Sequence, residues 1–178
     1  MDKFPTQLQI PRPESNEASS FYFKYIDQIE GDNALDAMQR QYFMATNFYQ
    51  NLPESKWAFR YEEGKWSIKQ VLLHVIDTER VFNYRAMRIA RGDTTPMPGF
   101  SENSYADHSR ADDRSPISLI EEYKSVRMST YSFFENLSPD VLNLHGIANG
   151  YSVSCRALAW IIAGHEFHHL NVIQERYF

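Results

Sequence analysis

Apolar residues recur every three or four positions in four stretches of the chain, which is the spacing of one face of an α-helix. These stretches cover residues 35–52, 68–89, 119–137 and 158–173. No stretch alternates between apolar and polar residues for long enough to predict a strand. The pattern therefore predicts an all-α protein, a four-helix bundle.

Residues that favour helix ends stand at the borders of these stretches. Ser67 with Gln70 three residues later is a capping box, and Ser115-Pro116 places a cap directly before a proline at the first helical position. Gly92 and Pro139 follow the ends of the second and third helices. The first helix can be capped by Asp32 or Asn33, and the fourth, after the turn signal Asn149-Gly150, by Ser152 or Ser154.

Two segments lie outside the four helices. We expect residues 1–30 to form an N-terminal arm with a short helix, because prolines and polar residues lead there to the aromatic segment 21–29. Residues 31–178 are expected to form the bundle. The connection 92–115 is the longest between helices, and it could cross the whole bundle and leave the second and third helices parallel.

Composition narrows the possible functions. Apolar residues make up 43% of the chain and charged residues 23%, as in ordinary globular proteins. The net charge of −5 argues against a nucleic-acid partner and against docking on an anionic membrane. No segment resembles a signal peptide or is long enough to span a bilayer, so a cytoplasmic location is expected. The single cysteine, Cys155, excludes an internal disulfide and any Cys-x-x-Cys metal site.

The most informative chemistry lies in the fourth helix. His165 and His169 are four residues apart in the middle of its apolar face, so their side chains lie one above the other. Two imidazoles that face a core need partners, and one divalent cation satisfies both. The alternative is a pair of buried neutral histidines that bond to backbone or polar groups.

The remaining ligands are less clear from the residues alone. The sequence His165-Glu-Phe-His-His169 matches the zinc-protease motif, but no downstream His or Cys is present to complete such a site. His74 lies beside the apolar face of the second helix, where it is either a third ligand or a boundary residue. His108 and His145 stand in segments expected to be solvated, and Cys155 is ten residues from His165, too far to bind the same ion.

Three stretches resemble the DinB superfamily of metal-binding four-helix bundles: residues 64–80, 88–93 and 156–172. The resemblance covers roughly residues 30–178. It implies a metal triad of His74, His165 and His169, a bundle that runs up-down-down-up, a zinc or nickel ion, and a homodimer.

Members of that family with known chemistry include transferases and isomerases that use low-molecular-weight thiols. The resemblance therefore favours a metal-dependent thiol S-transferase that joins a thiol cosubstrate to a small-molecule electrophile. One alternative is a metal-dependent hydrolase with Glu166 or Asp77 as the catalytic base. Another is a non-catalytic binding module with a structural metal. The sequence leaves these three functions open.

Overall fold

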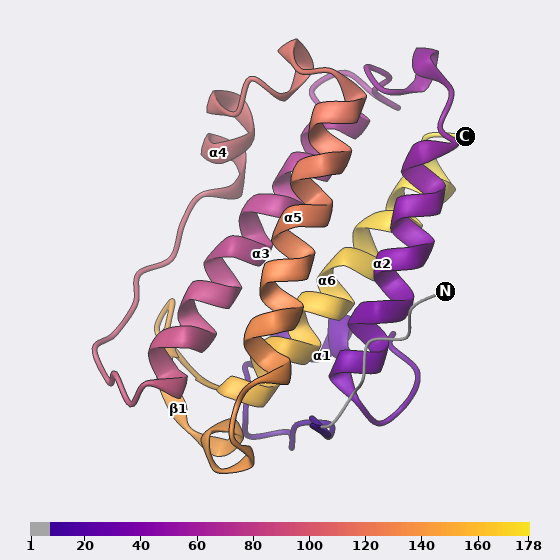
Figure 1. Cartoon of the computed structure of the whole chain (residues 1–178). Helices are drawn as coiled ribbons and strands as arrows, with labels where there is room; N and C mark the ends of the chain where they lie inside the picture. Colours follow the sequence, from indigo (N-terminus) through magenta and orange to yellow (C-terminus); the bar gives the residue numbers. More distant parts are fainter. Residues whose placement is uncertain (1–7) are drawn as a thin grey trace.

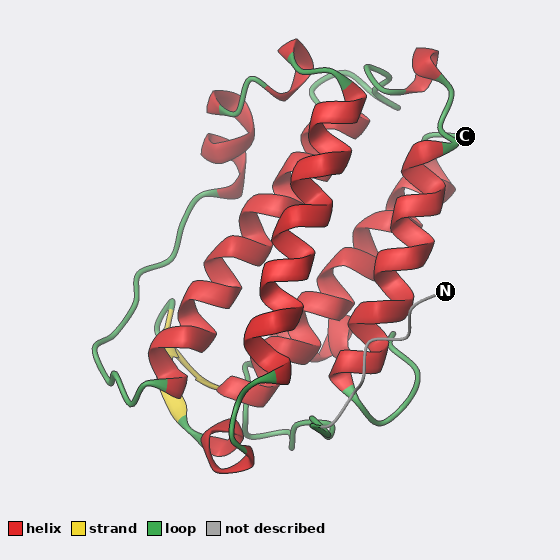
Figure 2. Cartoon of the chain, viewed as in Figure 1, coloured by secondary structure: helices red, strands yellow, loops and turns green. Residues whose placement is uncertain are grey.

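Four long helices form an elongated bundle in the computed structural model, which describes residues 8–178 (Figures 1 and 2). They are α2 (Ala34–Gln50), α3 (Ile68–Ala90), α5 (Pro116–Glu135) and α6 (Cys155–Arg176). The shorter elements are α1 (Ser20–Ile26), η1 (Glu54–Lys56), α4 (Glu102–His108), η2 (Ala111–Asp113), η3 (Pro139–Asn143), β1 (His145–Ala148) and β2 (Tyr151–Ser154). None of the helices within residues 8–178 has the length and apolar character that crossing a bilayer requires.

The long helices begin where their caps predict. The side chains of Asn33, Ser67, Ser115 and Ser154 each accept a hydrogen bond from a backbone N–H in the first turn of α2, α3, α5 and α6. At Ser67 the capping box is complete, because the Gln70 side chain also accepts from the Ser67 backbone. The sequence predictions for these four starts are confirmed.

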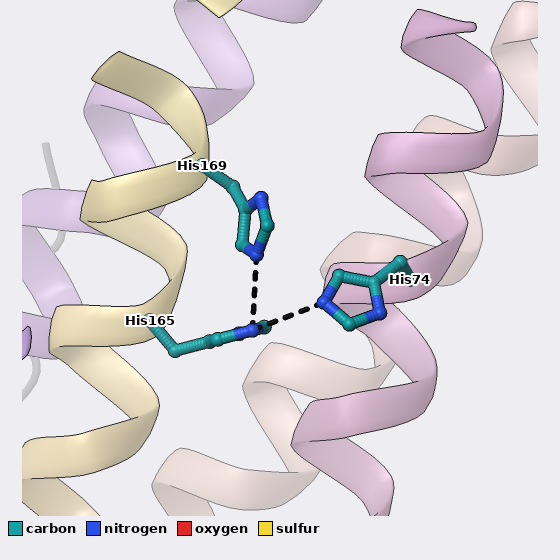
Figure 3. A group of neighbouring side chains, drawn as sticks. All are labelled: His74, His165 and His169. Atoms are coloured by element: carbon teal, nitrogen blue, oxygen red, sulfur yellow. Dashed lines mark hydrogen bonds between the residues drawn. The ribbon is translucent and has the colours of Figure 1, made fainter. Parts of the chain in front are cut away.

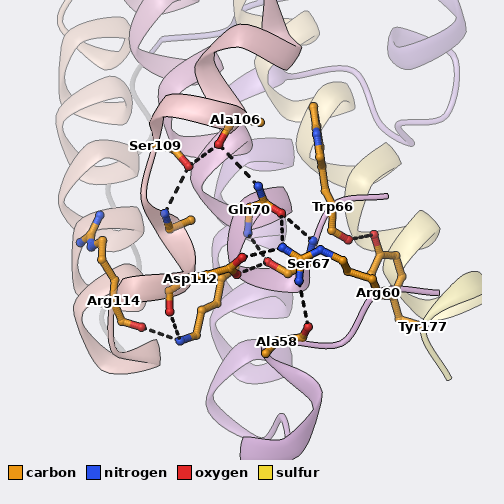
Figure 4. Close-up of polar contacts among 12 residues, drawn as sticks. Ala58, Arg60, Trp66, Ser67, Gln70, Ala106, Ser109, Asp112, Arg114 and Tyr177 are labelled. Carbon is orange, nitrogen blue, oxygen red and sulfur yellow. Dashed lines mark hydrogen bonds and ion pairs between the residues drawn. The ribbon is translucent and has the colours of Figure 1, made fainter. Parts of the chain in front are cut away.

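The connection between α3 and α5 runs back along the bundle, so both helices begin at the same end (Figure 1). The Lys69 ammonium group in the first turn of α3 donates to the carbonyl oxygens of Asp112 and Arg114, 3.1 and 2.6 Å away, just before α5. Ser67 Oγ and Arg60 Nη2 both lie 2.5 Å from carboxylate oxygens of Asp112 (Figure 4). These contacts anchor the far end of the connection.

A short hairpin corrects the expectation that the chain contains no strand. Strands β1 and β2 pair antiparallel through the two-residue turn Asn149-Gly150, in which both residues have positive φ angles, 52° and 81°. Met97 of the long connection bonds to the turn end of the hairpin, through Ile147 O at 2.8 Å and Asn149 N at 2.9 Å. Each strand has only four residues, too few for an alternating pattern to stand out.

The described part of the N-terminal segment packs into the bundle. Ile10 and Ile26 are buried, and Trp160 Nε1 of α6 donates to the carbonyl of Pro11 at 2.9 Å. α1 lies directly on α6, because a Cβ atom at Gly164 would stand 2.4 Å from the carbonyl oxygen of Tyr25. The glycine before His165 therefore permits α1 to approach the histidine pair.

Candidate metal centre

Three histidines converge between α3 and α6 (Figure 3). His165 Nε2 lies 3.1 Å from His74 Nε2 and 3.1 Å from His169 Nε2. The three residues can each offer one ring nitrogen within 4.8 Å of the others. The structure thus brings together the three histidines that the family resemblance implies.

Neighbouring aromatic rings restrict how the imidazoles can turn. The Trp66 ring lies 4.9 Å from the His74 ring, and the Tyr25 ring lies 5.7 Å from the His165 ring. Thr78 Oγ1, one turn after His74 on α3, is 3.4 Å from His74 Nδ1. When Nε2 of His74 binds a metal, Nδ1 carries the proton and can donate to this hydroxyl, which fixes the ring orientation.

Burial keeps these imidazoles neutral. It lowers the pKa of His74 to about 4. The pKa of His165 lies well below its ordinary value because of burial and the three neighbouring histidines, and the pKa of His169 is lowered by burial, His74 and His168. Since a histidine must be unprotonated to bind a metal, the group is held in its ligating state at neutral pH.

The nitrogen positions fit a divalent cation. Two nitrogens bound to one tetrahedral zinc, each about 2.0–2.1 Å from it, lie about 3.3–3.4 Å apart. The two 3.1 Å separations at His165 need only a small outward movement to match this geometry, and all three ligand nitrogens lie within 4.8 Å of one another. Three imidazoles also leave at least one coordination position open, as in catalytic rather than structural zinc sites.

Glu166, a candidate base from the sequence, is not brought to the triad. It is 3% exposed and points toward α5, where its Oε2 lies 2.9 Å from Arg127 Nη1. Arg127 also donates to both carboxylate oxygens of Glu79, through Nη2 at 2.8 Å and Nε at 3.0 Å. Although burial opposes it, the two carboxylates raise the pKa of Arg127, while burial raises the pKa of Glu166. We call these three residues the buried charge cluster.

Asp77, the other candidate base, also lies apart from the three histidines. Its Oδ1 is 3.3 Å from Arg80 Nη1, and it lines a surface hollow with His108 instead of a cavity at the triad. His108 and His145 are exposed, as expected from the sequence. Cys155 is buried in the first turn of α6, in agreement with its predicted distance from the histidines.

Two cavities reach the triad from different sides. A small one of about 60 Å³ is bordered by His165, Thr78 and Phe82, together with α1 and the long connection. An open groove of about 400 Å³ is bordered by His169, Trp66 and other residues near the start of α3 and the end of α6. A metal ion at the triad would therefore face two separate spaces.

Sequence reasoning did not identify one charged residue at this site, Arg85. It is buried on α3 and borders the small cavity with His165. It stands 11 residues after His74, which is about three helical turns and returns it to nearly the same face of α3. This spacing was the available signal, but it could not show that the long connection closes over the side chain.

The family profile of the DinB superfamily matches residues 37–173. This chain belongs to the DinB superfamily, as the sequence resemblance predicts. Solved structures with the same fold include YfiT from Bacillus subtilis, described as a probable metal-dependent hydrolase with an unusual four-helix bundle topology. That match has a TM-score of 0.69 and 14% identity over 92% of this chain and 90% of YfiT.

A second solved structure is a mycothiol-dependent maleylpyruvate isomerase, with a TM-score of 0.65 and 13% identity. The match covers 82% of this chain and 59% of that protein. No curated protein matches the chain in sequence. At these identities the structural likeness shows the shared fold, and the function must be argued from the residues of this chain.

Proposed function

We propose that this protein binds one zinc or nickel ion through His74, His165 and His169 and joins a low-molecular-weight thiol to a small electrophile. The observation that carries the proposal is the composition of the cluster. Among residues 8–178, the possible ligands that meet at this point are three imidazoles, with no carboxylate or cysteine. Neutral ligands leave a bound ion its full charge, which favours an anionic, soft thiolate in the open position.

The role of the protein side chains follows from their positions. A bound ion would supply the Lewis acidity that keeps a thiol deprotonated near neutral pH. The three histidines hold the ion, and Thr78 orients the ring of His74. The groove at His169 and the cavity at His165 give two substrates separate approaches to one point, which suits a transfer between two molecules held close together.

The two structural relatives support different chemistries. The isomerase is named for its dependence on a thiol, mycothiol, whereas YfiT is described as a probable hydrolase. Hydrolysis by a metal-bound water is commonly assisted by a general base near the ion. Here Glu166 is paired with Arg127 and Asp77 with Arg80, and neither carboxylate belongs to the triad. We therefore favour thiol transfer over hydrolysis.

The test uses the zinc- or nickel-loaded protein, a panel of small thiols and chlorodinitrobenzene as electrophile. In the assay reaction the thiolate sulfur forms a bond to the ring carbon, the carbon–chlorine bond breaks, and chloride leaves. The thiol proton passes to solvent. We expect a rate that requires the metal and the thiol and falls to the uncatalysed level in His165→Ala.

The matched control is His108→Ala, because His108 is exposed and its ring bonds to the Ser104 carbonyl of its own helix. It should retain the wild-type rate. The proposal is wrong if every thiol reacts at the uncatalysed rate with metal-loaded protein. Metal-dependent cleavage of an ester under those conditions would establish the hydrolase alternative instead.

A further inference from the structure

Arg85 is buried in the small cavity beside His165 and lacks an acidic partner. It is only 3% exposed, and its Nη2 donates to the carbonyl oxygen of Pro98 at 2.8 Å. Within residues 8–178, every ion pair that the structure forms involves other residues than Arg85. Its other polar neighbour in the cavity is the hydroxyl group of Tyr22, which is uncharged. A guanidinium group has five N–H donors, so donors remain for a ligand.

An unpaired buried charge is costly, and the same bundle contains a buried arginine that is fully paired. Arg127 is 1% exposed and contacts the carboxylates of both Glu79 and Glu166. Burying a guanidinium without such partners destabilises the fold. Residues that bind ligands often carry this kind of cost, because the missing partner is supplied by the ligand.

The walls of the cavity are built around this group. The Cζ atom of Arg85 lies 5.8 Å from the centre of the Phe82 ring and 6.0 Å from that of Phe100. The long connection and the hairpin meet tightly at one side, since a Cβ atom at Gly99 would stand 2.2 Å from Asn149 Oδ1. The resulting space of about 60 Å³ suits a group of a few atoms.

We propose that this cavity binds a carboxylate group of the substrate, held by Arg85 while the reacting end of the molecule lies at the histidine triad. The inference rests on the proposed function, because His165 borders the same cavity and would hold the metal. A planar carboxylate matches the paired N–H donors of a guanidinium and can accept two parallel hydrogen bonds. The substrate class is therefore a small electrophile that carries a carboxylate.

One acidic residue borders the cavity. Glu102, at the start of α4, is exposed, and it forms none of the ion pairs within residues 8–178. Its charge is screened by water, whereas that of Arg85 is buried, so the local field favours an anion at Arg85. Removing the charge in Glu102→Gln should strengthen carboxylate binding slightly.

The test measures binding to the metal-free protein, so its result does not depend on turnover. Butyrate and its uncharged counterpart butyramide are titrated by calorimetry at constant ionic strength. We expect wild-type protein to bind butyrate about tenfold more tightly than butyramide, the effect of hydrogen bonds to a charged group. Arg85→Met should lose this preference. Arg91→Gln, an exposed arginine on the same segment, should retain it.

The stability of the variants separates a binding role from a structural one. If Arg85 serves binding, Arg85→Met should unfold at the wild-type temperature or higher, because an unpaired buried charge is removed. Should that variant fail to fold, Arg85→Lys decides: it keeps the charge but loses the planar fork, and the preference for butyrate should fall at least threefold. An unchanged preference in either variant overturns the inference, as does tighter binding of inorganic phosphate than of butyrate.

Zinc binding and the thiol-dependent rate are measured in parallel. Arg85→Met should bind zinc as wild type does, since Arg85 is not a ligand. If the butyrate preference depends on Arg85 but no thiol reaction occurs, the thiol-transfer proposal fails while the carboxylate site stands. If the reaction occurs but the preference is absent, only the carboxylate site fails.

Discussion

His165 and Glu166 are neighbours in sequence, yet their buried side chains lie in very different surroundings. His165 points toward α3 and α1, where three neutral imidazoles meet and two cavities open. Glu166 points toward α5, where Arg127 pairs with it and with Glu79 in the buried charge cluster. Both residues are nearly fully buried, at 6% and 3% exposure.

The difference lies in how polar groups are satisfied. In the buried charge cluster, one arginine forms ion pairs with two carboxylates, and Glu166 lines neither of the two cavities at the triad. At the triad, the imidazoles have few partners besides one another, and Arg85 beside them has no carboxylate. Ion pairs within the protein link α3, α5 and α6, whereas polar groups without such partners beside a cavity indicate a binding site.

The largest effect should come from breaking the buried charge cluster. Arg127→Ala leaves two buried carboxylates without their cation, and we expect a loss of about 3–5 kcal/mol in the free energy of unfolding. Urea unfolding measures it. The control Arg80→Ala removes an exposed arginine that pairs with Asp77 and Glu122, and should cost less than about 1 kcal/mol. Equal losses in the two variants would contradict the structural role of the cluster.

Zinc binding tests the histidine triad. At a free zinc concentration about 100 times its dissociation constant, the wild-type protein should gain about 2.7 kcal/mol of stability. His169→Ala removes one ligand and should show neither this gain nor stoichiometric zinc, while its metal-free form stays folded. Metal analysis and thermal unfolding with and without a chelator provide the measurement. Stoichiometric zinc in His169→Ala would mean that the triad is not the metal site.

A second carboxylate–arginine pair, between Glu17 of the N-terminal segment and Arg156 in the first turn of α6, predicts a pH effect on stability. Although burial opposes it, hydrogen bonds from Arg156 and Ser154 lower the pKa of Glu17 to about 2. The unfolded chain therefore takes up a proton at higher pH than the folded one. The contribution of this group is present above about pH 4.5 and is lost as the pH falls toward 2, by about 3 kcal/mol in all.

Unfolding measured between pH 5 and pH 3 checks this contribution. Glu17→Gln cannot release or bind the proton, so its stability should fall less steeply over that interval than that of the wild type. The slope difference should persist when zinc is removed, because Glu17 lies apart from the triad. Identical slopes in the two proteins would show that the folded-state pKa of Glu17 is ordinary.

The sequence predicted the long helices well because their signals are local. Each cap, such as Ser67 with Gln70, needs only residues within one turn. The hairpin was missed because each strand has only four residues, and its further partner, Met97, lies about 50 residues earlier in the chain. The helix Glu102–His108 was likewise hidden inside a connection without a long apolar pattern.

In the candidate site, too, only the local features could be predicted from the sequence. The spacing of His165 and His169 within one helix is visible in sequence, whereas His74 joined them only through the family resemblance, since helix packing brings it there. Glu79 stood among the apolar positions of its helix, a signal of a buried charge, but its partner Arg127 lies 48 residues away. Ion pairs between side chains distant in sequence depend on the tertiary structure. The same holds for the lack of a carboxylate partner at Arg85.

The smallest effect should come from Asp77, because this carboxylate belongs neither to the histidine triad nor to the buried charge cluster. Asp77 lies three residues after His74, on a different face of α3, with its side chain 30% exposed beside Arg80. We expect Asp77→Asn to change stability by less than about 1 kcal/mol, as for other exposed ion pairs. Zinc stoichiometry and the thiol-dependent rate should stay within about twofold of wild type, because the chemistry proposed for the triad needs no carboxylate base. A loss of metal-dependent turnover of 100-fold or more in Asp77→Asn, with zinc still bound, would instead identify Asp77 as the base and favour the hydrolase function.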